Sequence, residues 1–128
     1  MSSIKDKRSK EMSDNYNTPS WIKEIFKDWY DPCPISKGEL REFDGLGSWK
    51  DRTFVNPPYS KPMPWVEKAI AENKKGKMIV MLLKVNTSTK WFARLIEAKA
   101  EIMWFNKRLK FLNNKPANFP SMLVILPK

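Results

Sequence analysis

The sequence predicts an α/β protein in which a mostly parallel sheet is covered by helices on both faces. Short apolar runs alternate along the chain with segments whose apolar residues recur every three or four positions. The run from Met78 to Leu83 is apolar throughout, which is typical of a strand buried on both faces. Strands that alternate with helices indicate βαβ units, and these place neighbouring strands parallel.

The chain length suits one domain. Its 128 residues are 41% hydrophobic and 30% charged, a balance typical of a globular protein with a single core. Residues 1–13 are charged and lack apolar periodicity, so we expect a disordered basic tail there and one domain over residues 14–128. No apolar run approaches the ~20 residues that would cross a bilayer, so we expect no membrane partner.

The first helix is expected to begin with Thr18 as N-cap and Pro19 at the first helical position. Its apolar face would consist of residues at helical spacing, namely Trp21, Ile22, Ile25, Phe26 and Trp29. Tyr30–Asp31–Pro32 ends this pattern, and a short extended segment could lie there, closed by Pro32 and Pro34.

The remaining elements follow a loose stretch over residues 35–52. In chain order they are a strand at Thr53–Val55, a helix at Pro64–Asn73, a strand at Met78–Leu83, a helix capped by Thr87 or Ser88, a strand at Glu101–Phe105, a short strand at Leu109–Phe111 and a final strand at Met122–Leu126. Five tryptophans on apolar faces are interpreted as core: Trp21, Trp29, Trp65, Trp91 and Trp104.

The chain contains no histidine and one cysteine, Cys33. This composition excludes an internal disulfide, a multi-cysteine metal site and zinc sites built on histidine. It also excludes serine–histidine nucleophiles and imidazole acid–base catalysis. We therefore expect no metal, and an enzyme of this composition needs chemistry without imidazole.

Positive charge gathers in one part of the chain. The net charge is +10, and residues 74–115 carry eleven basic and two acidic side chains, whereas residues 13–73 carry eight basic and ten acidic ones. A basic half favours a polyanionic partner such as nucleic acid. A solvated lysine-rich surface is the alternative.

Asn56–Pro57–Pro58–Tyr59 follows the strand that ends at Val55, where an α/β protein places its ligands. The two prolines fix φ and remove two donors, so the turn is rigid. The carbonyl oxygens of Asn56 and Pro57 can accept the two N–H bonds of an aromatic amino group and stabilise the positive charge that develops as its nitrogen attacks a methyl donor. Tyr59 can stack on a purine. The alternative is a proline-terminated strand with a surface tyrosine.

This tetrapeptide resembles the catalytic motif of amino-group methyltransferases, and the wider pattern is similar to the small phage-type DNA N6-adenine methyltransferases. The resembling pieces, in that family's order, are Asn17–Thr18–Pro19, Asp31–Pro32, Asp44–Gly45–Leu46, Trp49, Phe54–Ser60, Pro64–Trp65–Val66, Met81–Leu82–Leu83, Trp91–Phe92, Arg108–Phe111 and Phe119–Pro120–Ser121. The resemblance covers roughly residues 14–128. It implies a single Rossmann-like domain that uses S-adenosylmethionine (SAM) to methylate the N6 amino group of adenine in DNA, in a viral or mobile-element protein of a host cytoplasm.

The resemblance also implies site residues. Thr18 and Pro19 would lie along the methionine part of SAM, Asp31 would meet its ribose or amino acid part, and Asp44 would accept a hydrogen bond from its adenine. The catalytic residues would be Asn56, Pro57, Pro58 and Tyr59, with Phe111 on the opposite face of the target base. The choice of DNA sequence would come from the loops Lys84–Lys90 or Lys107–Lys115, or from a second subunit in a homodimer. Lys84, Lys90, Arg108 and Lys110 would contact the DNA.

Each assignment has a structural alternative. Thr18 and Pro19 also suit a plain helix start, Asp31 and Asp44 suit turns, and Phe111 suits the core. Trp49 could be core or line the cofactor pocket.

The sequence departs from many SAM enzymes at Asp31–Pro32–Cys33–Pro34, where they have a glycine-rich turn. This departure keeps open the hypothesis of an inactive DNA-binding protein on a methyltransferase fold. The tetrapeptide also occurs in amino-group methyltransferases that act on cytosine in DNA, guanine in RNA or glutamine in protein, so these substrates stay open as a second alternative.

Overall fold

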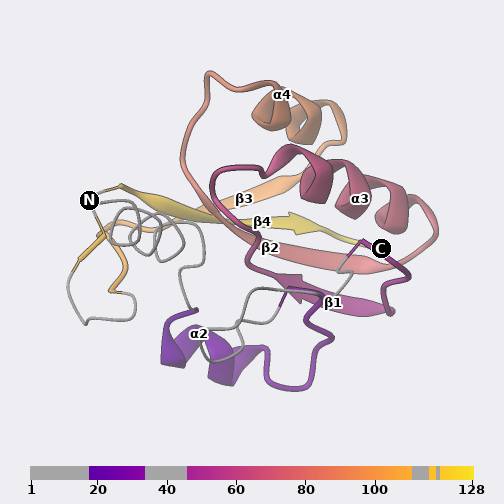
Figure 1. The fold of residues 1–128 in the computed structure, drawn as a ribbon, viewed down its shortest axis with the longest axis horizontal. Helices are drawn as coiled ribbons and strands as arrows, with labels where there is room; N and C mark the ends of the chain where they lie inside the picture. The colour runs from indigo at the N-terminus through magenta and orange to yellow at the C-terminus, as the bar shows by residue number, and fades with distance from the viewer. Residues whose placement is uncertain (1–17, 34–45, 111–115, 118) are drawn as a thin grey trace, which may run out of the picture.

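The computed structural model describes residues 18–33, 46–110, 116–117 and 119–128. Its elements in chain order are α2 (Ser20–Ile25), β1 (Arg52–Val55), α3 (Met63–Lys74), β2 (Met78–Lys84), α4 (Lys90–Glu97), β3 (Glu101–Trp104) and β4 (Ser121–Leu126), shown in Figure 1. These four strands and α3 were predicted at nearly these bounds. Of the short strand predicted at Leu109–Phe111, the described residues show only an isolated antiparallel bridge between Lys110 and Pro116. Among the described residues, no helix has the length and apolar character needed to cross a membrane.

The sheet is mixed, in the order β1-β2-β4-β3. β1 and β2 are parallel, whereas β4 runs antiparallel to both of its neighbours. The prediction of a mostly parallel sheet is therefore wrong. An apolar run such as that of β4 indicates burial on both faces but carries no information on strand direction.

The direction of β4 leaves three strands that run the same way. β3 is antiparallel to β4, which is antiparallel to β2, so β1, β2 and β3 all point toward one edge of the sheet. We call this edge, where these strands end at Val55, Lys84 and Trp104, the carboxyl edge. β4 begins at the same edge with Ser121, which pairs with Lys84.

Two apolar clusters show that helices cover both faces, as predicted. On one face α3 and α4 pack against alternate residues of the sheet, including Val55, Ile79, Met81, Met122 and Val124. On the other face the intervening residues Phe54, Val80, Leu82 and Leu123 meet Ile22 of α2 together with Leu109 and Ala117. Figure 1 shows α3 and α4 above the sheet and α2 below it.

A short extended segment adds to the sheet beside β1, as predicted. Tyr30 forms a parallel bridge with Thr53. The Tyr30 N–H donates to the Arg52 carbonyl at 3.0 Å, and the Phe54 N–H donates to the Tyr30 carbonyl at 2.9 Å. Asp31 therefore lies beside β1, near the carboxyl edge.

The first helix is shorter than predicted. α2 ends at Ile25, and the next residue, Phe26, stacks on Phe54 with ring centroids 4.5 Å apart. Only Ile22 of the helix is buried, whereas Trp21 is 52% exposed and Ile25 60% exposed. A six-residue helix presents too narrow a face to bury all the residues at helical spacing.

The other tryptophans divide between core and surface. Trp91 and Trp49 are buried and belong to the same core cluster, and Trp29 and Trp65 are half-buried. The interpretation of Trp21 and Trp104 as core is wrong. Trp104 is 53% exposed because it ends β3, which lies at an edge of the sheet.

α4 has a different cap from the predicted one. The N-cap is Thr89, not Thr87 or Ser88, and its Oγ1 accepts a hydrogen bond from the Phe92 N–H at 3.2 Å. Trp91 and Leu95 of this helix are buried.

A buried carboxylate ties the start of β1 to α3. Glu72 is fully buried, and its Oε1 accepts hydrogen bonds from the Trp49 N–H at 3.0 Å and from Lys77 Nζ at 2.6 Å. Its Oε2 pairs with Lys75 at 2.9 Å and with Lys68 at 3.4 Å. Burial by itself raises the pKa of Glu72, but the hydrogen bonds and these positive charges outweigh it and hold the pKa well below its usual range.

Candidate active site

The Asn-Pro-Pro-Tyr motif begins directly after β1, at the carboxyl edge. Asn56 and Pro57 are buried, and Pro58 and Tyr59 are half-buried. The strand ends here because neither proline has an N–H to donate to the ladder. The motif is thus a rigid turn at the position where the sequence predicted it.

Asn56 is oriented by a residue far away in the chain. Its Nδ2 donates to Thr18 Oγ1 at 3.3 Å. The amide nitrogen therefore faces Thr18, and the carbonyl oxygen points the other way. Because the amide group is buried and tethered, its carbonyl has a fixed direction.

Thr18 and Pro19 do not cap α2 in the way the sequence predicted. Pro19 occupies the N-cap position, and no side chain caps the helix. The Pro19 carbonyl accepts from the N–H groups of Ile22 and Lys23. The Thr18 side chain is consequently available for Asn56.

Three side chains from three segments meet beside this turn. The rings of Tyr59 and Phe119 lie edge to face with centroids 5.2 Å apart. Lys84 Nζ stands 5.7 Å from the centroid of Phe119. Lys84 thus lies within the site, at the end of β2, and the edge contact of Phe119 restricts the position of the Tyr59 ring.

A cavity of about 360 Å³ opens between α2 and the segment that carries Tyr30. This volume falls in the range of small-molecule pockets, about 300–1,000 Å³. Its apolar lining consists of Phe26, Trp29 and Phe54, and its polar lining is Thr18, Ser20, Lys23, Glu24, Lys27 and Asp31. The cavity therefore brings together two residues that the family resemblance assigned to the cofactor, Thr18 and Asp31.

Asp31 also stabilises its own turn. Its Oδ1 accepts a hydrogen bond from the Cys33 N–H at 2.9 Å. The turn alternative for Asp31 is thus present in the structure together with its place in the cavity.

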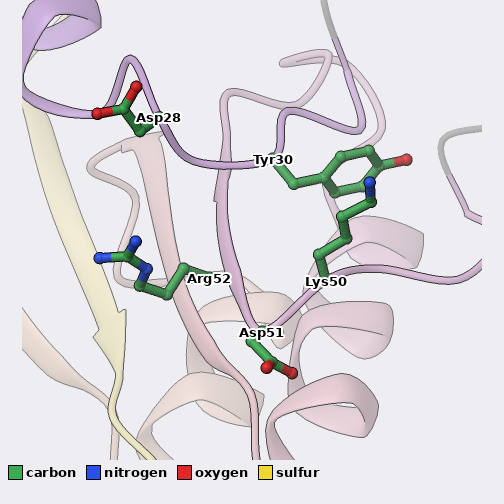
Figure 2. A pocket seen from close by; sticks show the side chains of 5 residues that line it. All are labelled: Asp28, Tyr30, Lys50, Asp51 and Arg52. Carbon is green, nitrogen blue, oxygen red and sulfur yellow. The ribbon is translucent and has the colours of Figure 1, made fainter.

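A second hollow lies at the opposite end of β1 and lacks a convergent set of groups. It is lined by Asp28, Tyr30, Lys50, Asp51 and Arg52. In Figure 2 Lys50 reaches over the Tyr30 ring on one side of the strand, while Arg52 and Asp28 lie on the other side. Asp51 points away from these side chains. This arrangement offers no shared centre for catalysis.

The other predicted DNA contacts are exposed. Lys90 begins α4, and Arg108 and Lys110 lie on the segment after β3. Asp44 and Phe111 lie outside the described residues. The described residues contain no group of histidine, cysteine, aspartate or glutamate side chains that could hold a metal ion.

Sequence reasoning missed Phe119 as a site residue. It was noted only as part of the resembling tripeptide before β4. Its separation of 60 positions from Tyr59 leaves no periodic signal in the chain. The contact depends on β4 beginning at the carboxyl edge. In the parallel sheet that the sequence predicted, β4 would instead end there.

Comparison with known proteins identifies the family of this chain. The family model described as DNA N-6-adenine-methyltransferase (Dam) matches residues 42–126, well over half of the chain. The chain belongs to this family. The region that matches the Dam family includes the Asn56 motif and all four strands, and it begins after Thr18 and Asp31.

Two relatives of this Dam family member come from phages. It is 41% identical over 86 residues to the DNA N-6-adenine-methyltransferase of Haemophilus phage HP1 (strain HP1c1), across 60% of this chain and 50% of that protein. It is 41% identical over 56 residues to the protein of the same name from Escherichia phage T1, across 44% of this chain and 24% of that protein. The chain thus spans about half of the first relative's length and about a quarter of the second's.

Proposed function

We propose that this chain transfers a methyl group from SAM to the N6 amino group of adenine in DNA. The observation that carries the proposal is the Asn-Pro-Pro-Tyr turn at the carboxyl edge of β1, with Asn56 oriented by Thr18. Membership of the Dam family and the names of the two phage relatives support this substrate. Residues 14–128 would form a single Rossmann-like methyltransferase domain, and residues 1–13 a basic tail.

The lining of the α2 cavity fits SAM by its chemistry. SAM combines a flat purine with a ribose and a charged amino acid, and it supplies an electrophilic methyl group on sulfur. The cavity offers aromatic side chains for the purine and polar groups of both signs for the rest. Thr18 and Asp31 would hold the cofactor, with Pro19 beside them and Asp44 as a further ligand.

Asn56 and Pro57 act on the amino group of the target base. The lone pair of that nitrogen is delocalised into the purine ring, so it is a weak nucleophile. The Asn56 side-chain carbonyl and the Pro57 backbone carbonyl accept its two N–H bonds, which favours a pyramidal nitrogen and stabilises the positive charge that develops during attack. The hydrogen bond with Thr18 fixes the Asn56 carbonyl before the base arrives, so no reorganisation is needed.

Tyr59 holds the plane of the base. An adenine that has left the DNA helix can stack on the Tyr59 ring, which its contact with Phe119 restrains. Phe111 would lie on the opposite face of the base, and Lys84, Lys90, Arg108 and Lys110 would contact phosphates. A phage protein of this kind would act on DNA in the host cytoplasm.

The test is transfer of a labelled methyl group from SAM to unmethylated DNA, followed by nucleoside mass spectrometry. We expect N6-methyladenine with the intact chain and none with Asn56→Ala, while SAM affinity stays nearly unchanged. Asn73→Ala is the matched control, because Asn73 Nδ2 bonds the Lys77 and Leu126 carbonyls away from the site. Activity in Asn56→Ala equal to that of the intact chain would contradict the mechanism.

A further inference from the structure

A large aromatic side chain lies exposed at the carboxyl edge, where Trp21 of α2 contacts Phe105 after β3. Trp21 is 52% exposed, although tryptophan side chains are on average largely buried. It lies in the first turn of α2, three residues after Thr18, whose hydroxyl group bonds Asn56. The exposed indole is thus close in the chain to the residue that orients the catalytic amide.

The Trp21 ring is held by a contact from the far strand. Phe105 follows β3 at the carboxyl edge, and its ring lies edge to face with Trp21 at a centroid distance of 5.8 Å and an angle of 84°. Ile22 of the same helix shares a buried cluster with Leu109. Segment 105–110 therefore packs alongside α2, and Trp21 is braced while half of its surface faces solvent.

The charge around this contact favours DNA as the molecule that covers Trp21. Lys107, Arg108 and Lys110 are exposed on the same segment, directly after Phe105. A second copy of the chain would bring the same three cations against one another, which is unfavourable. A polyanion instead meets both the positive charge and an aromatic ring on which bases stack.

We propose that Trp21 is a DNA contact that stacks on a base next to the target adenine. This inference rests on the proposed function. An adenine that leaves the helix exposes the faces of its neighbouring bases, and a braced aromatic ring at the same edge of the sheet as the Asn-Pro-Pro-Tyr motif can replace the lost stacking. Trp21 is thus a binding residue, distinct from Tyr59, which holds the target base.

The experiment compares Trp21→Ala, Trp21→Phe and Ile25→Ala. Ile25 is the matched control, because it is 60% exposed on the same helix and cannot stack. The probe is an unmethylated DNA duplex of mixed sequence, and its Kd is measured at several salt concentrations. We expect Trp21→Ala to raise the Kd about ten-fold, Trp21→Phe to retain most of the affinity and Ile25→Ala to match the intact chain.

The salt dependence separates stacking from charge. An indole carries no charge, so the slope of log Kd against log salt should be the same in Trp21→Ala as in the intact chain. A Kd for Trp21→Ala equal to that of Ile25→Ala overturns the inference. A dimer of the intact chain that Trp21→Ala dissociates in sedimentation also overturns it, in favour of a second copy as the partner.

The proposed function has a separate readout. SAM binding and N6-methyladenine formation by the intact chain report on it alone. Methylation by the intact chain together with an unchanged Kd in Trp21→Ala rejects only the stacking contact. Absent methylation with weakened DNA binding in Trp21→Ala rejects the proposed function, and with it the target adenine, but leaves Trp21 as a DNA contact.

Discussion

At the scale of single residues, one hydrogen bond joins parts of the site that are 38 positions apart in the sequence. The Thr18 hydroxyl accepts from Asn56 Nδ2, and the Thr18 side chain also lines the cavity that would hold SAM. The methyl donor and the Asn56 amide, which receives the target base, would thus both contact Thr18. Sequence reasoning assigned Thr18 to the cofactor and placed it at the helix cap, but it did not foresee the link with Asn56.

Thr18→Val keeps the shape of the side chain and removes the hydroxyl group. We expect kcat for adenine methylation to fall about ten-fold, because the Asn56 amide loses the bond that fixes its direction. Thr18→Ser should retain most of the activity. Equal rates for the valine and serine variants, measured with saturating SAM and DNA, would show that this bond does not orient Asn56.

Glu72 lies outside the site and had no signal in the sequence. It follows Lys68 and precedes Lys75 at helical spacing, the usual pattern of a solvated helix face. Glu72 is buried where the segment before β1 packs against α3, and its carboxylate accepts a hydrogen bond from the Trp49 N–H. Local periodicity does not predict a contact between residues 23 positions apart.

The contribution of Glu72 to the stability of the protein should depend on pH. Its folded pKa is below the ordinary value of 4.5, so its contribution to stability is complete above that value and is lost as the pH falls below it. We expect the free energy of unfolding, measured with urea, to decline from about pH 5 to about pH 3. The decline should be less steep in Glu72→Gln, which has no carboxyl group at this position to protonate.

The same substitution should also destabilise the protein at neutral pH. Glu72→Gln leaves Lys77 without a buried counter-charge, at a cost of about 2 kcal/mol. Glu67→Gln is the control, because Glu67 is exposed and pairs with Arg94 at the surface, so its loss should cost less than about 1 kcal/mol. Similar unfolding midpoints for the two variants would contradict this role.

At the scale of elements, the start of α4 gives a direct test of a helix cap. Thr89 Oγ1 accepts the Phe92 N–H, whereas the sequence offered Thr87 and Ser88 as equally good caps. Thr89→Ala should lower the free energy of unfolding by about 1 kcal/mol. Ser88→Ala should leave it nearly unchanged, and the opposite order in thermal unfolding would assign the cap to Ser88.

The elements predicted best are those whose signal is local. α3 and β2 were predicted within one residue at each end, because each carries a continuous local pattern, α3 beginning among prolines and β2 following Gly76. The length of α2 and the direction of β4 were predicted wrongly. The first depends on Phe26 meeting Phe54, and the second depends on which strands flank β4, so both are set by contacts distant in sequence.

At the scale of the whole molecule, the positive charge is unevenly distributed along the chain, and part of it lies near the site. Residues 74–115 hold most of the excess, yet only some of these cations lie near the carboxyl edge. Lys74 and Lys99 stand at the opposite edge, where α3 ends and β3 begins. We therefore expect the cations near the carboxyl edge to bind DNA, and those at the opposite edge to make no contact with it.

Two double variants of equal charge test this distribution. Arg108→Gln with Lys110→Gln should weaken DNA binding and lower the slope of log Kd against log salt by about two, because each phosphate contact contributes about one. Lys74→Gln with Lys99→Gln should leave the slope unchanged. The same loss of slope in both would mean that net charge alone attracts the DNA.

The position of β4 bears on how the protein is made. Although it is the last of the described strands to leave the ribosome, it lies between β2 and β3 and pairs with both. Until residues 121–126 emerge, β3 has no strand partner among the described elements, and the inner edge of β2 stays open. Synthesis of β4 therefore acts as a late closing step, before which a nascent chain exposes unpaired strands that chaperones could bind.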